Sequence, residues 1–166
     1  MTNLNIFLEN TYKEYNIDDT ALHKDIMKIA DFIFADEKIV EHSCLEGYKY
    51  STISFDIVFV NNEEIHRINK EYRQKDSPAD VITFALFADS IEEERYILDE
   101  EINLGEIVVS LDKIEEQSKE NSVTFNDELY FLVSHGILHL LGYDHRNEEE
   151  YRFMVENQNK AKAVVL

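Results

Sequence analysis

Cysteine, proline and tryptophan are almost missing from this chain of 166 residues, which has one Cys, one Pro, four Gly and no Trp. The lone thiol, Cys44, excludes an internal disulfide and a zinc site built on cysteines, and it agrees with a reducing compartment. No stretch rich in Pro, Gly or Ser resembles an interdomain linker. Because a domain usually has about 100–200 residues, we expect residues 1–166 to form a single domain.

Long apolar runs are also missing. No stretch approaches the roughly 20 apolar residues that cross a bilayer. The N-terminal segment has neither the basic start nor the apolar centre of a signal peptide. These absences predict a cytoplasmic protein without a membrane partner.

Basic residues are scarce, with 16 Lys and Arg against 35 Asp and Glu and a formal net charge of -19. Such a chain repels phosphate backbones, because nucleic acids are held by Lys and Arg that displace counterions. A protein that coats duplex DNA is therefore excluded, and an RNA ligand requires a local basic patch or a cation. A hydrophobic content of 44%, with 10 Phe and 9 Tyr, supplies a core and excludes general disorder.

The hydrophobic pattern predicts a few strands followed by a helical C-terminal half. Strands are expected at 51–60, 81–86 and 106–110, and helices at about 19–36, 111–120, 126–141 and 148–160. Another helix places Ile65, Ile68 and Tyr72 on its inner face. The helix at 126–141 is apolar all round, which predicts burial on every side. This order favours an α+β fold in which a small mixed β-sheet packs against helices.

An acidic insertion at about 91–101 separates the second and third predicted strands. Its acidic residues are Glu92, Glu93, Glu94, Asp99, Glu100 and Glu101. Charge runs are usually solvated surface, so we expect a hairpin or loop there.

Three histidines near the end of the helix at 126–141 have the spacing of metal ligands. His135 and His139 are one helical turn apart, so their imidazoles leave the same face. Gly142 permits a sharp turn that brings His145 back toward them. Three neutral imidazoles at about 2.0–2.1 Å hold three corners of a zinc tetrahedron and leave the fourth to water. Imidazole also suits nickel, copper and iron, so another divalent transition metal stays open.

A histidine in an apolar helix is more often a core residue with one hydrogen bond than a ligand. Two such residues in one buried helix would both need partners, since an unpartnered buried polar group costs about 1–3 kcal/mol. A shared metal removes that cost. Gly136 adds a second indication, because glycine inside a helix costs about 1 kcal/mol relative to alanine and is tolerated where something approaches the backbone. We predict one bound ion, with zinc as its identity.

The spacing also fits the metzincin peptidase pattern H-E-x-x-H-x-x-G-x-x-H, except at one position. The Glu after the first His is the general base of those proteases, and this chain has Gly136 there. A metzincin-like metallopeptidase is therefore the weaker alternative.

Residues 135–145, H-G-I-L-H-L-L-G-Y-D-H, resemble the H-G-x-L-H-L-x-G-Y-D-H hallmark of the YbeY rRNA maturation factors, which are bacterial metal-dependent endoribonucleases. Upstream, N-K-E-Y-R-Q-K-D at 69–76 is similar to the family's N-x-x-Y-R-x-K-D. The strands D-V-I-T-F at 80–84 and L-G-E-I-V-V-S at 104–110 are similar to T-D-V-L-S-F and L-G-D-I-x-I-S. The chain departs from the family's motifs at three positions, where Ala79 replaces Thr, Ala85 replaces Pro and Glu106 replaces Asp. These differences affect the expected shape of the cleft wall beside the metal.

The resemblance implies a zinc-dependent, single-strand-specific endoribonuclease that acts in 16S rRNA 3′ end maturation and in ribosome quality control. Its implied partners are single-stranded rRNA and the small ribosomal subunit, whose basic proteins suit the acidic exterior. With His135, Arg73 is the expected catalytic residue. A guanidinium donates two parallel hydrogen bonds to phosphate and stays charged. A non-catalytic ribosome assembly factor with a structural metal is the remaining alternative.

Three further basic residues, Arg67, Lys70 and Lys75, make the region around Arg73 the one concentrated basic patch of the sequence. We predict that they contact RNA, although a solvated helix face is an equal alternative for Arg67 and Lys70. Asp144 is expected either to orient a ligand imidazole from outside the coordination sphere or to shape the turn before His145.

Overall fold

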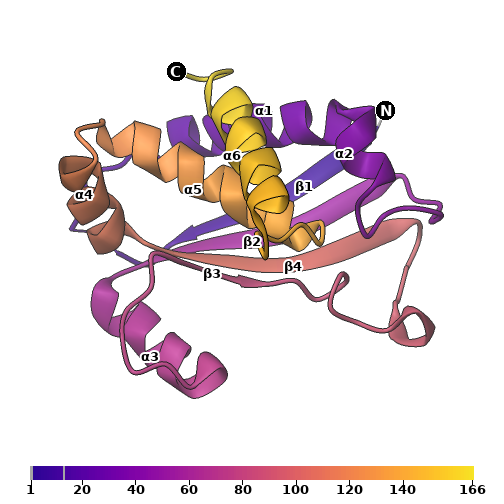
Figure 1. Ribbon diagram of the computed structural model, residues 1–166, viewed down its shortest axis with the longest axis horizontal. Coiled ribbons are helices and arrows are strands. Elements are labelled where there is room, and N and C mark those ends of the chain that lie inside the picture. Colours follow the sequence, from indigo (N-terminus) through magenta and orange to yellow (C-terminus); the bar gives the residue numbers. More distant parts are fainter. Residues whose placement is uncertain (1, 13) are drawn as a thin grey trace.

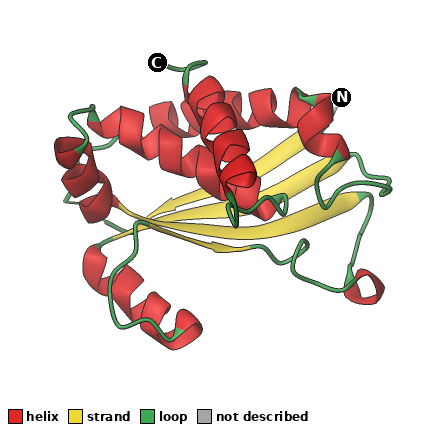
Figure 2. Ribbon diagram, viewed as in Figure 1, coloured by secondary structure: helices red, strands yellow, loops and turns green. Residues whose placement is uncertain are grey.

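The computed structural model describes residues 2–12 and 14–166, and it consists of one sheet with helices on both faces (Figures 1 and 2). The elements are β1 (Asn3–Asn10), α1 (Asp19–Ala35), α2 (Glu37–Glu41), β2 (Thr52–Val60), α3 (Asn62–Arg73), β3 (Val81–Phe84), the 3-10 helix η1 (Glu92–Glu94), β4 (Glu101–Ser110), α4 (Leu111–Glu120), α5 (Phe125–Leu140) and α6 (Glu148–Lys162). None of the helices within these residues has the length and apolar character that a membrane crossing demands.

The sheet has the strand order β1-β2-β4-β3. The strand β2 runs parallel to β1 and to β4, whereas β3 is antiparallel to β4 and forms an edge. The helices α1 and α5 cover one face, α6 packs on these two helices, and α3 lies on the other face (Figure 1). This mixed sheet with segregated helices confirms the predicted α+β fold.

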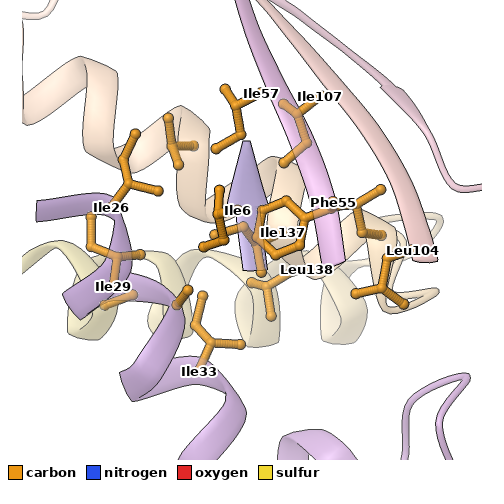
Figure 3. Close-up of a cluster of buried hydrophobic side chains, with 14 of the residues drawn as sticks. Ile6, Ile26, Ile29, Ile33, Phe55, Ile57, Leu104, Ile107, Ile137 and Leu138 are labelled. Carbon is orange, nitrogen blue, oxygen red and sulfur yellow. The ribbon is translucent and has the colours of Figure 1, made fainter. Parts of the chain in front are cut away.

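The main core lies between the sheet and the layer formed by α1 and α5. Figure 3 shows Ile26, Ile29 and Ile33 of α1 facing Ile6, Phe55, Ile57, Leu104 and Ile107 of the strands, with Ile137 and Leu138 of α5 beside them. The helix α5 approaches β4 closely at Gly136, where an added Cβ would stand 2.8 Å from Cγ2 of Ile107. The close approach predicted from Gly136 is therefore confirmed, and its partner is a strand side chain.

Helix ends follow local sequence signals. Asp18 caps α1 by accepting hydrogen bonds from the backbone N–H groups of Thr20 and Ala21. At the start of α5, Thr124 and Asp127 satisfy each other's backbone N–H groups in a capping box. These caps agree with the predicted helix starts to within a residue or two.

The acidic insertion is largely a loop, as predicted, with η1 inside it and Glu92, Glu93 and Glu94 exposed. Its last residue, Glu101, instead begins β4, so the third predicted strand starts five residues earlier than 106. The second predicted strand ends earlier than expected, at Phe84. The early part of β4 was missed, although the buried Ile102 and Leu104 alternate there with the polar Glu101 and Asn103, as in a half-buried strand.

Three expectations were wrong or incomplete. The strand β1 was not predicted, because Phe7 is 65% exposed and interrupts the alternation of Leu4, Ile6 and Leu8. Tyr72 is not buried as expected, because it is 59% exposed and meets the sheet through an edge contact with Phe84, with ring centroids 5.6 Å apart. The helix α5 is not buried on every side, because positions 131, 135 and 139 form a partly exposed strip.

Candidate metal centre

His135 and His139 lie on the partly exposed strip of α5, one helical turn apart. The helix ends at Leu140, and Gly142 with φ of +96° reverses the chain. His145 is thereby brought to the same place, with ring centroids 5.4 Å from His135 and 5.3 Å from His139. Ligand nitrogens of the three imidazoles lie within 4.8 Å of one another. The structure brings together the three residues that the sequence predicts as ligands.

In two of these rings, Nδ1 already makes a hydrogen bond within the protein. The Nδ1–H of His139 donates to the backbone carbonyl of Tyr143 at 2.7 Å, and the Nδ1–H of His135 donates to Oε1 of Gln158 at 3.2 Å. Both rings therefore carry their lone pair on Nε2, and these two Nε2 atoms stand 2.9 Å apart. Ligands of one tetrahedral ion at about 2.0–2.1 Å are separated by about 3.4 Å, so a small adjustment accommodates a shared ion.

The protonation state also suits a metal. Burial, then the neighbouring imidazole of His139, lowers the pKa of His135 to about 4, against the effect of its hydrogen bond to Gln158. Burial also lowers the pKa of His139, and the charges of His145 and Arg73 act in the same direction. Both imidazoles are neutral at pH 7, which is the form that binds a metal ion. The donor set thus fits a metal that prefers imidazole nitrogen.

A cleft of about 640 Å³ opens beside the histidines. The end of α3, the edge strand β3 and the turn after α5 form its wall, and its charged side chains are Arg73, Lys75, Asp80, Asp89 and Asp144. The imidazoles therefore share one concavity with two cations and three carboxylates.

Arg73 is the last residue of α3, and the left-handed residue Gln74 (φ 55°) ends the helix directly after it. Its guanidinium donates through Nη2 to the carbonyl of Thr83 at 2.6 Å and lies over the ring of Phe84, 5.7 Å from the centroid. These contacts from β3 hold an exposed arginine at the wall of the cleft. Its remaining N–H donors are available to an anion.

A family model described as Endoribonuclease YbeY matches residues 7–164. The chain belongs to this family. Two curated proteins named Endoribonuclease YbeY illustrate the similarity. That of Bacillus licheniformis is 45% identical over 125 residues, which cover 75% of this chain and 79% of that protein. That of Thermoanaerobacter pseudethanolicus is 34% identical over 165 residues, which cover 96% of each.

A solved structure has a similar fold. The solution structure of TM1509 from Thermotoga maritima has a TM-score of 0.59 and 28% sequence identity, and the match covers 95% of this chain and 86% of that one. The fold is therefore shared with this solved structure over nearly the whole sequence.

The basic residues around Arg73 separate into two groups in space. Lys75 lines the cleft with Arg73, whereas Arg67 lies outside it and is bound to Glu64 and Glu71. Lys70 is also outside the described cleft wall, 4.0 Å from Asp76. Arg67 and Lys70 accordingly have local acidic partners, and their contact with RNA stays a prediction.

Asp144 has a clear local role in the turn. It accepts a hydrogen bond from the backbone N–H of His145 at 2.8 Å, which holds the pKa of this carboxyl below its usual value. Its distance to Nδ1 of His145 is 3.7 Å, longer than a hydrogen bond. The turn interpretation of Asp144 therefore has direct geometric support, and orientation of the ring stays a prediction.

Two positioning residues were missed from the sequence. Gln158 of α6 is 2% exposed, and its amide N–H donates to the carbonyl of Phe131, which aims Oε1 at His135. Asn69 donates to the carbonyl of Ser77, and its own carbonyl accepts from the backbone of Lys75. Asn69 thus shapes the loop that carries Lys75, which accounts for the first letter of the YbeY-like motif.

Replacing Gln158 with leucine is expected to weaken metal binding by about 10–100-fold, the usual cost of losing an outer partner of a ligand histidine. Leucine keeps the volume of the buried side chain but leaves the Nδ1–H of His135 without its acceptor. Titration with a chromophoric chelator measures the affinity. The matched control is Asn157→Leu, since Asn157 is also buried on α6 but bonds only the carbonyl of Phe153. Equal affinities in the two variants would contradict this role for Gln158.

Proposed function

We propose that the chain is a zinc-dependent endoribonuclease that cleaves single-stranded RNA, acting in maturation of the 16S rRNA 3′ end and in ribosome quality control. The observation that carries this proposal is the meeting of three converging imidazoles with Arg73 in one cleft. The names of the curated relatives support the reaction class, because they describe endoribonucleases. A substrate of this kind places the chain in the cytoplasm.

His135, His139 and His145 would hold the ion, which when bound supplies a Lewis acid for a phosphoryl oxygen and lowers the pKa of water toward about 7. Gln158 and the carbonyl of Tyr143 keep the Nε2 atoms of two ligands turned into the cleft. Neither ring therefore needs to turn over or lose a proton before binding, and only a small shift of the rings is required. This part of the site is preorganised by the chain itself.

Arg73 binds the scissile phosphate in this proposal. Its anchorage on Thr83 and Phe84 lowers the entropy lost when the guanidinium grips two phosphate oxygens. Lys75 adds a second positive charge to the same wall. Asp80, Asp89 and Asp144 oppose the approach of several phosphates at once, which favours one strand over a duplex of higher charge density.

A metzincin-like metallopeptidase needs a glutamate base directly after the first histidine, and this chain has none at that position. The position after the first histidine is occupied by Gly136, which packs against Ile107. The following experiment distinguishes an enzyme from an assembly factor whose metal is purely structural.

Arg73→Ala is expected to reduce cleavage of a single-stranded RNA oligonucleotide by about 100-fold or more, as for loss of one charged group that stabilises a transition state. The metal content should stay that of the parent, because Arg73 contacts Thr83 and Phe84 rather than a histidine. A fluorescent cleavage assay measures the rate, and elemental analysis measures the metal.

Arg152→Ala is the matched control, because Arg152 is an exposed arginine of α6 paired with Glu148 and outside the cleft wall. If Arg73→Ala cleaves RNA as fast as Arg152→Ala, the catalytic role of Arg73 is wrong. If neither parent nor variants cleave RNA while metal is bound and ribosome maturation is normal, the structural-metal alternative is favoured.

A further inference from the structure

Exposed apolar side chains are concentrated in the segment that joins β3 to β4. Leu86 is 61% exposed and Tyr96 is 71% exposed, and Ile91 and Leu98 are exposed to a similar degree. These four belong to one stretch of thirteen residues, 86–98. Single exposed apolar residues need no explanation, but a group of them on one segment marks an interaction surface.

Three of these side chains line a groove. Leu86, Tyr96 and Leu98 surround a hollow of about 490 Å³. The charged residues of its rim are three acids and one arginine, namely Glu94, Asp99, Glu101 and Arg95. This apolar groove lies beside the cleft of the metal centre, because the neighbouring residues Ala85 and Asp89 form part of that cleft wall. An occupant of the groove would therefore lie beside the cleft of the metal centre.

The segment is held firmly although its apolar side chains point outward. The guanidinium of Arg95 lies over the paired rings of Tyr48 and Phe87, 5.6 and 5.0 Å from their centroids, and donates to the carbonyls of Phe87 and Ala88. Ile97 packs against the main core. The groove is thus a preformed surface, and binding there requires little ordering of the chain.

The turn into β4 strengthens this anchorage. Leu98 and Glu101 exchange both backbone hydrogen bonds, and the two residues between them, Asp99 and Glu100, have φ of 52° and 60°. The carbonyl of Glu100 also accepts from Ser51 and Thr52. The backbone of Leu98, which lines the groove, is therefore fixed by the turn. Figure 1 shows the course of the segment between β3 and β4 at its lower right.

The charges around the groove select its occupant. Six acidic residues of the 91–101 segment would repel the phosphates of an RNA strand. A second copy of the chain carries the same charge of -19 and would be repelled as well. Lysine and arginine side chains would pair with the rim, and an apolar side chain would fill the groove.

We propose that this groove docks a cationic protein segment in which apolar side chains alternate with Lys and Arg, presented beside the RNA that the metal centre cleaves. The proposal rests on the proposed function for the nature of its partner, a basic protein of the small ribosomal subunit. Docking there would deliver the substrate strand to a cleft whose own field attracts RNA weakly.

The experiment compares the parent with the double variant Tyr96→Ser/Leu98→Ser, using purified small ribosomal subunits as the probe. We expect co-sedimentation to weaken by about tenfold or more, the loss typical of removing anchor residues from an interface. Tyr151→Ser is the matched control, because Tyr151 is an exposed tyrosine of α6 that does not line the groove. Equal binding of the double variant and the control would overturn the proposal.

A photo-reactive benzoylphenylalanine in place of Tyr96 identifies what lies in the groove. The expected crosslink withstands ribonuclease and is removed by protease after release from the subunit. A crosslink to rRNA, or to a second copy of the chain, would overturn the choice of a cationic protein. Cleavage of a free RNA oligonucleotide should be unchanged in the double variant; if the parent also fails to cleave it, the proposed function fails while the docking result stands separately.

Discussion

Alanine in place of His139 is expected to abolish metal retention and, with it, RNA cleavage. The Nε2 of His139 lies 2.9 Å from that of His135, so its loss removes one of three converging donors. The loss of affinity should exceed the roughly 10–100-fold that follows loss of an outer partner, because a direct ligand disappears. Elemental analysis after dialysis measures the metal, and the oligonucleotide assay measures cleavage.

His42→Ala is the matched control for this prediction, since His42 is exposed and ends the short helix α2 away from the cleft wall. Melting temperatures provide a readout that is independent of catalysis. Added zinc should raise the melting temperature of the parent and of His42→Ala, because a ligand that binds only the folded state stabilises it. A His139→Ala protein that retains zinc through dialysis and gains the same thermal stability would contradict the ligand assignment.

Gly105→Ala is expected to destabilise the fold by about 3 kcal/mol or more, from backbone strain and overpacking together. Gly105 has φ of +126°, and a Cβ added there would overlap the carbonyl oxygen of Phe84 and lie 2.9 Å from the amide nitrogen of Leu86. Both obstacles are backbone atoms and cannot rotate away. For a chain of this size, each kcal/mol lowers the melting temperature by about 2–4 °C.

The chain supplies its own control at Gly47, which has φ of +81° but no heavy atom within 4 Å of an added Cβ. Gly47→Ala therefore tests conformational strain alone, with an expected cost of about 1 kcal/mol. Thermal unfolding followed by circular dichroism compares the two variants. If Gly105→Ala is no less stable than Gly47→Ala, the close approach of β3 to Gly105 does not limit the fold.

The helices were largely predictable because their signals are local. Leu22, Ile26 and Ile29 repeat at helical spacing, and the start of α5 has a capping box. The early part of β4 also has a local signal, because Ile102 and Leu104 alternate with polar residues, but Gly105 breaks this alternation. The strand continues past that glycine because residues on both sides of it pair with β2. The exposure of Tyr72 likewise depends on how far α3 extends beyond the sheet.

The site was predictable to the extent that its residues are near one another in the sequence. His135, His139 and His145 needed only helical geometry and one glycine turn to meet. Gln158 needed the packing of α6 on α5, for which no spacing rule exists. Arg67 and Lys75 are near each other in the sequence, but only Lys75, which follows the end of α3, lines the cleft.

The hydrogen bond from Arg73 to the carbonyl of Thr83 has a consequence for solubility. Thr83 belongs to β3, an edge strand, and free edge carbonyls invite pairing with strands of other molecules. A charged side chain that occupies such a carbonyl makes this edge unattractive to another strand. The arginine proposed to bind phosphate thereby also protects the four-residue edge strand β3 from aggregation. One side chain would serve both phosphate binding and protection of the sheet edge.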